Sequence, residues 1–163
     1  MTTKYKKEKE AIRTQIHKKV RYYVKSKGIT FFYNETPVNN KLYTIDDNDI
    51  EVLLIKLNRT KKVLITTKCL FIIYKNKSHR IDGDTIESFD YLEMSMSYDE
   101  FMALPKLQKA YIRYKVNFRI GKYRIIKKDG SYIDLNSRRT RFSDCLNDSI
   151  KKLKFVVNKY EGT

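Results

Sequence analysis

The sequence has no tryptophan and is poor in residues that cross-link or interrupt a chain. It contains two cysteines, two prolines and five glycines in 163 residues. Two cysteines are too few for the disulfide framework of a small secreted domain. Cys69 lies in an apolar stretch and Cys145 in a helical pattern, so we expect both to be buried, reduced and unpaired. No apolar run approaches the ~18 residues that a membrane-spanning helix needs, so the sequence predicts no such helix.

The first residues, Met1 to Lys7, are polar and basic and lack the apolar core of a secretory signal peptide. Together with the expectation of reduced cysteines, this predicts a soluble protein of the cytoplasm. A chain of this length suits one domain, because it is long enough to bury roughly 68–70% of its unfolded surface.

Histidine is also scarce, since His17 and His79 are the only two. The chain therefore lacks Ser-His-Asp, Cys-His and HExxH sets, and it has neither a P-loop nor a GxGxxG motif. His79 lies close in sequence to Asp82 and Asp84, but the group falls in a turn between expected strands. We predict a non-catalytic protein without a cofactor. A cryptic nuclease built from scattered carboxylates and lysines remains the enzymatic alternative.

Acidic residues are few, with 19 Asp and Glu against 35 Lys and Arg and a formal net charge of +16. Such an excess favours anionic partners: an acidic protein, an anionic lipid surface or nucleic acid. An AT-rich genome is the other explanation, because it enriches Lys, Ile, Asn and Tyr together. That bias accounts for Lys over Arg better than for the shortage of acids.

The densest group of acids is the turn Asp46-Asp47-Asn48-Asp49. Oxygen-rich loops bind calcium, but this one lacks the glycine and the distal glutamate of an EF-hand loop. We therefore predict an acidic turn without a metal ion.

The stretch from Val63 to Phe89 is the densest apolar segment and is predicted to form the sheet core. Branched and aromatic residues favour strands, and the polar triplet Thr66-Thr67-Lys68 divides the run into two of them. Further strands are expected after a polar break at Asn76. Other predicted strands span 29–34, 41–45, 51–57, 91–97, 111–118, 122–127 and 131–135. The last two flank Lys128-Asp129-Gly130, a hairpin signal. Residues 97–108, with Pro105, are read as a short helical insertion.

A helix is predicted from Tyr5 to Lys27, ended by Gly28. Its apolar stripe consists of Ile12, Ile16, Val20 and Tyr23, with Val24 at its edge. The opposite face carries Lys7, Lys18, Arg21 and Lys25. This face is either a solvated charged surface or a basic ridge that lies against an anionic partner.

The last helix has the clearest period, with an apolar stripe of Phe142, Leu146, Ile150, Leu153, Val157 and Tyr160. We expect Leu146, Ile150 and Leu153 to be buried together with Phe71 and Ile73. Phe155 points to the opposite side, where we expect the first helix to cover it; an exposed anchor for a partner is the alternative. Arg138, Arg139 and Arg141 precede or open this helix.

Residues 41–160 resemble a bacterial pleckstrin-homology-like domain of the PH/GRAM-like superfold. The resemblance rests on the strand–turn–strand run Leu64 to Ile73, the stretch Ile81 to Phe89, the late hairpin around Lys127 to Ser131, and the closing helix from Phe142 to Val157. It implies an α+β fold: an antiparallel PH-like β-barrel or sandwich of about seven strands closed by a C-terminal amphipathic helix. The N-terminal helix, residues 1–28, is an addition to the domain at 29–163.

Proteins of that superfold are mostly binding modules for lipid head groups, peptides or proteins, which implies the same for this chain. We expect it to engage an acidic protein partner or an anionic surface, as an immunity-type or regulatory protein of bacteria. The expected binding residues are Lys18, Arg21, Lys25, Arg138, Arg139, Arg141 and Phe155. Nucleic-acid binding is the alternative, because Tyr22, Tyr23, Tyr111, Tyr114 and Tyr123 lie among basic residues; strand packing also explains these tyrosines.

Overall fold

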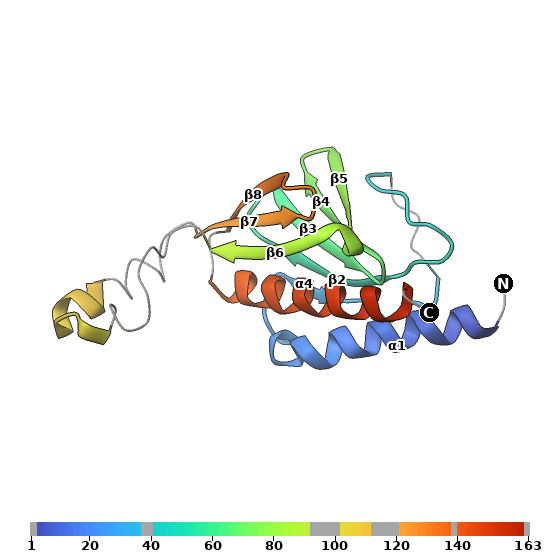
Figure 1. Ribbon diagram of the computed structural model, residues 1–163, viewed down its shortest axis with the longest axis horizontal. Helices are drawn as coiled ribbons and strands as arrows, with labels where there is room; N and C mark the ends of the chain where they lie inside the picture. Colours follow the sequence, from blue (N-terminus) through green and yellow to red (C-terminus); the bar gives the residue numbers. More distant parts are fainter. Residues whose placement is uncertain (1–2, 37–40, 92–101, 112–120, 138–139, 162–163) are drawn as a thin grey trace.

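Two antiparallel sheets and two long helices build an α+β fold in a computed structural model that describes residues 3–36, 41–91, 102–111, 121–137 and 140–161 (Figure 1). The helices are α1 (Thr3–Val20) and α4 (Thr140–Glu161), with short 3-10 turns η1 (Arg21–Tyr23) and η2 (Gly83–Thr85). The strands are β1 (Ile29–Phe31), β2 (Glu51–Lys56), β3 (Lys61–Thr66), β4 (Cys69–Tyr74), β5 (Lys77–Asp82), β6 (Ile86–Tyr91), β7 (Gly121–Lys127) and β8 (Tyr132–Ser137).

The first sheet runs in the order β1-β2-β3-β4-β5, so each strand pairs with its neighbour in sequence. The predicted core stretch supplies β3, β4, β5 and β6, and Thr67 and Lys68 form the turn between β3 and β4. Leu64 pairs with Phe71 and Ile65 with Leu70 across this hairpin. The division of the run at its polar triplet is confirmed.

Both faces of this sheet are buried, and this overturns one prediction. Leu70 and Ile72 belong to the core shared with α4, whereas Phe71 and Ile73 belong to a second cluster on the other face. Successive strand residues point to opposite faces, so one strand fills two cores. The expectation that Phe71 and Ile73 are buried together with the α4 stripe is therefore wrong, although all are buried.

The second sheet has the order β6-β7-β8 and contributes Ile86, Ile125 and Leu135 to the core beneath α4. Gly130 has a φ of 80°, which glycine adopts without strain in the tight β7–β8 turn. The predicted hairpin is confirmed. Among the described residues, no ladder joins the two sheets into a closed barrel, and eight strands are present where about seven were expected.

The helix α4 lies across the sheets as its stripe predicts, with Phe142, Leu146, Ile150, Leu153 and Val157 all buried. Cys69 and Cys145 are buried and free, which confirms that they are unpaired. Tyr160 lies outside the residues whose side chains are described.

The helix α1 packs beside α4 and adds Ile12, Ile16 and Val20 to the same core (Figure 1). It ends at Val20, earlier than predicted, because η1 and a turn follow before β1. Gly28 lies in that turn with a φ of 96° and does not cap α1.

In the remaining segments, the structure differs from the prediction at residues 41–45 and at Tyr111. Residues 41–45 form no strand beyond a bridge at Tyr43, and Leu42, Tyr43 and Ile45 instead pack on the outer cluster of the first sheet. Residues 102–103 and 106–111 are helical, so Pro105 precedes a helical turn and Tyr111 is not in a strand. The predicted strand at 91–97, beyond its first residue, and the remainder of the one at 111–118 lie outside the described residues.

Candidate functional site

Phe155, one of the predicted binding residues, lies on α4. Its side chain is 58% exposed, so the expectation that α1 covers it is wrong. The ammonium of Lys152 lies over the ring at 4.5 Å from its centroid. A cation above an exposed aromatic face stabilises the ring in water without burying it. Phe155 is thus available as the exposed anchor that the sequence offered as the alternative.

Three residues of the predicted basic ridge are exposed: Lys18 on α1, Arg21 on η1 and Lys25 in the turn that follows. The side chain of Lys7 is outside those described, so the name basic ridge is kept for these three. Arg21 donates a hydrogen bond to the hydroxyl of Tyr22 and lies 5.1 Å from that ring's centroid. This contact holds the pKa of Tyr22 below its ordinary value. Among described carboxylates, none forms an ion pair with the ridge.

The two long helices run antiparallel, so the end of α1 lies beside the first half of α4 (Figure 1). Lys19 of α1 pairs with Asp148 of α4 at 3.6 Å, which fixes this alignment. The ridge and the start of α4 consequently lie at the same end of the molecule. Arg138 and Arg139 fall outside the described residues, and so does the side chain of Arg141.

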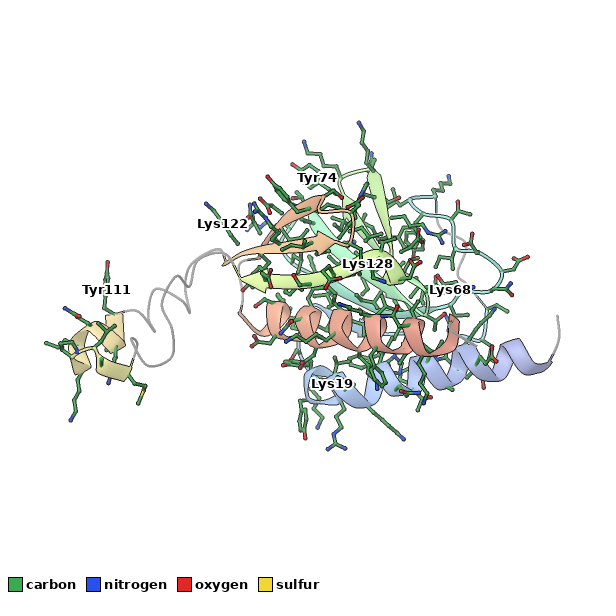
Figure 2. All side chains as sticks on the ribbon, in the orientation of Figure 1. Lys19, Lys68, Tyr74, Tyr111, Lys122 and Lys128 are labelled. Atoms are coloured by element: carbon green, nitrogen blue, oxygen red, sulfur yellow. The ribbon has the colours of Figure 1, made fainter. Side chains whose placement is uncertain are left out.

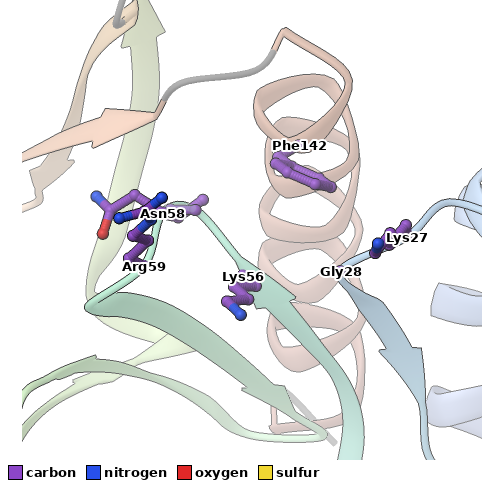
Figure 3. A pocket seen from close by; sticks show the side chains of 7 residues that line it. Lys27, Gly28, Lys56, Asn58, Arg59 and Phe142 are labelled. Carbon is purple, nitrogen blue, oxygen red and sulfur yellow. The ribbon is translucent and has the colours of Figure 1, made fainter.

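A pocket of about 450 Å³ opens at that same end, where three distant segments of chain meet (Figure 3). We call it the basic pocket; its lining residues are Lys27, Gly28, Lys56, Leu57, Asn58, Arg59 and Phe142. Gly28 precedes β1, the segment 56–59 joins β2 to β3, and Phe142 stands in the first turn of α4.

Backbone geometry builds one wall of the basic pocket. The Lys56 N–H donates to the Gly28 carbonyl at 2.8 Å, which brings the two segments together. A methyl group at position 28 would lie 3.1 Å from the Phe142 ring. Glycine is therefore favoured at position 28 for two reasons: the backbone has a positive φ, and a side chain would be crowded by the Phe142 ring.

The β2–β3 loop is held by the side chain of Asn58. Its Oδ1 accepts hydrogen bonds from the backbone N–H groups of Thr60 and Lys61, at 2.9 and 2.8 Å, and from the Thr60 hydroxyl. Asparagine favours such turns because its side chain satisfies the local backbone. Arg59 is consequently presented from a formed loop.

The cations of the basic pocket differ from Arg80 and Arg124 in making no ion pair with a described residue. Arg80 pairs with Asp46 and Asp82, and Arg124 with Asp134, whereas no ion pair within the described segments involves Lys27, Lys56 or Arg59. Lysines project from many sides of the fold, for example Lys19, Lys68 and Lys122 (Figure 2). The pocket is therefore distinguished by concavity and unpaired charge together.

Asp49 is a residue whose place the sequence did not predict. It is 1% exposed, although we read it as part of an acidic turn. Its carboxylate accepts from the Thr66 and Thr67 hydroxyls, both at 2.6 Å, and from the backbone N–H of Ile50 and Lys68 at 2.9 and 3.1 Å. These bonds make Asp49 the internal brace of the β3–β4 turn. Within the described residues, no group of three acidic, cysteine or histidine side chains is placed to hold a metal ion.

The two histidines occupy different settings. His17 makes a 2.8 Å hydrogen bond through Nε2 to the Val52 carbonyl and lies between Phe31 and Tyr33, with centroid distances of 4.9 and 5.1 Å. Burial lowers the pKa of His17 below its ordinary value. This histidine links α1 to the sheet. His79 is exposed on β5, where it pairs with Ile72 across the ladder.

Comparison with known proteins gives no relative from which a role could be transferred. No protein-family model, curated protein or solved structure matches the chain. In the part of the chain that the structure describes, no helix is long and apolar enough to cross a membrane. The site must therefore be interpreted from its own chemistry.

Proposed function

We propose that this protein is a non-catalytic binding module whose basic surface engages an acidic protein partner. The observation that carries the proposal is the gathering of cations without acidic partners at one end of the molecule. The basic ridge lies there, and the basic pocket adds Lys27, Lys56 and Arg59. A surface of one charge sign accelerates encounter with a partner of the opposite sign and disfavours other partners.

The strand order supports the PH-like assignment as part of this proposal. Four consecutive antiparallel strands, β2 to β5, are followed by three more, β6 to β8, and then by α4. This is the succession that the resemblance implies, with β1 and α1 as additions at the amino-terminal side. Folds of this kind carry sites of many types, so the charge pattern, rather than the fold, carries the functional argument.

An immunity-type or regulatory role in bacteria follows from the same chemistry. A protein that neutralises an acidic toxin needs a fast encounter, and complementary charge supplies it. Phe155, exposed on α4, offers an apolar contact of the kind that anchors interfaces.

Nucleic-acid binding is the second candidate, and Tyr22 is the observation that favours it. Tyr22 is 78% exposed beside Arg21, as an aromatic ring that stacks on a base would be. The other tyrosines are divided: Tyr111 is 57% exposed on a helical turn, whereas Tyr23 packs against the core, Tyr123 is 7% exposed, and Tyr114 lies outside the described residues.

The test compares a Lys18→Glu/Arg21→Glu/Lys25→Glu variant with the wild type. The probes are polyglutamate, vesicles of phosphatidylserine in phosphatidylcholine, and short duplex DNA, each titrated from about 0.05 to about 0.3 M salt. We expect polyglutamate to bind most tightly and the variant to weaken that binding about tenfold while retaining its fold.

A matched control reverses Lys77, Lys106 and Lys128, which are exposed on other elements and make the same change in net charge. We expect this control to bind polyglutamate nearly as the wild type does. Equal binding by all three proteins would show that the charge is compositional and would overturn the proposal. Preferential DNA binding with a steep salt dependence would favour the second candidate.

A further inference from the structure

The basic pocket combines two kinds of surface that a single partner residue cannot satisfy alone. Its lining includes Gly28, Leu57 and Phe142, the last two of which are 1% and 7% exposed, while Lys27, Lys56 and Arg59 supply positive charge. The stems of long basic side chains also cover apolar surface while their charged ends remain in water. A volume of about 450 Å³ lies in the range of small ligand sites and holds a side chain with part of its neighbours.

The charge around the pocket is more concentrated than the lining alone suggests. Lys56 lies directly opposite Lys62 in the β2–β3 ladder. Like charges opposite one another in an antiparallel pair are destabilising, because the Cβ atoms of such a pair are only about 5 Å apart. Among the described residues, no carboxylate pairs with either lysine to relieve this repulsion, so a bound anion would do so.

We infer that the basic pocket recognises an acidic segment of the protein partner, with carboxylates paired with Lys27, Lys56 and Arg59 and one apolar side chain lying over Gly28 and the exposed edge of the Phe142 ring. The inference rests on the proposed function and adds to it the place and the chemistry of recognition. A lining that is part apolar and part cationic suits a peptide, since a phosphate group would leave the apolar part without a contact.

The pocket is also formed before any ligand arrives. Asn58 holds the loop that carries Arg59, and the Lys56 to Gly28 hydrogen bond holds the opposite wall. Binding to a formed site avoids part of the entropic cost of ordering loops. Recognition of a short segment is therefore feasible without a rearrangement of the two sheets.

The experiment titrates the isotope-labelled full chain with the acetylated, amidated peptide Asp-Glu-Phe-Asp-Glu and follows backbone amide shifts. We expect the largest shifts at Lys27, Gly28 and residues 57–59. A Lys27→Glu/Lys56→Glu/Arg59→Glu variant should bind at least about tenfold more weakly, because three attractive contacts become repulsive. The Lys77→Glu/Lys106→Glu/Lys128→Glu control should lose less than about threefold.

Two further peptides test the apolar part of the inference. Replacing the central phenylalanine by serine should weaken binding about tenfold, since a buried aromatic contact is lost. Replacing the four acids by asparagine and glutamine should abolish the shifts. If the serine peptide binds equally well, or the pocket variant and the control lose affinity equally, the pocket inference is wrong.

The same proteins separate this inference from the proposed function. Loss of peptide binding in the ridge variant but not in the pocket variant would overturn the pocket inference and leave the proposed function in place. Unchanged binding in both variants would overturn both. Pocket-dependent binding of phosphatidylserine vesicles or short duplex DNA that exceeds peptide binding would replace the peptide by a phosphate-bearing ligand. If the triple pocket variant does not fold, Lys27→Gln, placed in a turn, gives the same comparison.

Discussion

Replacement of Asp49 by alanine tests how far one buried carboxylate holds the β3–β4 hairpin. Five hydrogen bonds from protein donors end on this side chain, the weakest of them from the Cys69 thiol at 3.5 Å, and four of those donors have a second acceptor close by. The Thr66 hydroxyl lies 2.9 Å from the Cys69 carbonyl, and the Ile50 N–H lies 3.3 Å from the Thr67 hydroxyl oxygen. The Lys68 N–H and the Cys69 thiol lie 3.4 and 3.2 Å from the Thr66 hydroxyl oxygen. The alanine variant therefore leaves the Thr67 hydroxyl without an acceptor and the Lys68 N–H with only a long hydrogen bond.

A buried donor left without an acceptor costs about 1–3 kcal/mol, and the Lys68 N–H is weakened rather than orphaned, so Asp49→Ala should lower the free energy of unfolding by about 2–4 kcal/mol. The substitution also removes a negative charge near Lys9. Burial lowers the pKa of Lys9, and the Asp49 carboxylate partly opposes that effect. A loss of this size is a large share of the 5–15 kcal/mol typical of a whole domain. Urea unfolding followed by far-ultraviolet circular dichroism measures it in a chain without tryptophan.

Asp49→Asn is the informative companion variant. Its amide oxygen retains an acceptor for Thr67, Lys68 and Ile50, and its amide nitrogen donates to Thr66, whose own hydroxyl then donates to Cys69. We expect less than half the loss seen with alanine. Asp47→Ala, an exposed neighbour, should change stability by less than about 0.5 kcal/mol. If Asp49→Asn lowers the free energy of unfolding as much as Asp49→Ala does, the negative charge and not the hydrogen-bond geometry stabilises the turn. A loss below about 1 kcal/mol in Asp49→Ala would show that this side chain does not stabilise the turn.

Three further predictions concern the core and its ionisable groups. Leu153→Ala removes a fully buried side chain of α4 and should cost about 2–5 kcal/mol in urea unfolding; a loss below about half a kcal/mol would contradict this burial. Burial raises the pKa of the Cys69 and Cys145 thiols to about 12. Above about pH 9 the thiols therefore ionise in the unfolded protein but not in the folded one. Each cysteine should then lower the free energy of unfolding by about 1.4 kcal/mol per pH unit. A double Cys→Ala variant should show a flatter alkaline decline, and an unchanged decline would refute the cause. Because burial lowers the pKa of His17, the unfolded protein takes up a proton at this residue at a higher pH than the folded protein does. The free energy of unfolding should therefore fall as the pH drops below about 6.5. The His17→Gln variant should lack this decline when unfolding is measured between about pH 7 and 5.5.

The consecutive strands of the core and the closing helix could be predicted because their patterns are local. The polar triplet at Thr66 and the Asp-Gly pair at Asp129 mark turns, and the stripe through Leu146 has a helical period over the whole of α4. The partition of Phe71 and Ile72 between two cores could not be predicted, because a strand buried on both faces has no polar alternation to reveal its sides.

The candidate site was harder to predict because it is assembled from distant segments. Gly28, Arg59 and Phe142 meet only in the folded chain, and the glycine was read as a helix cap. Asp49 was read with its acidic neighbours as solvated. Its informative neighbours in the sequence were the apolar Ile50 that follows and the hydroxyl residues Thr66 and Thr67, 17 and 18 positions later, which bond to it.

The antiparallel packing of α1 and α4 has a consequence for how the molecule can be attached to anything else. Thr3 and Glu161 lie at one end of the helix pair, whereas Phe142 and the turn that holds Lys27 lie at the other (Figure 1). At 1.5 Å per residue, the 22 residues of α4 place roughly 33 Å between these ends. A surface tether, a fluorescent label or a fused protein joined at Thr3 or at Glu161 therefore leaves the basic pocket facing away from the attachment. Immobilisation on a biosensor through either of these two residues presents the same orientation to a soluble probe.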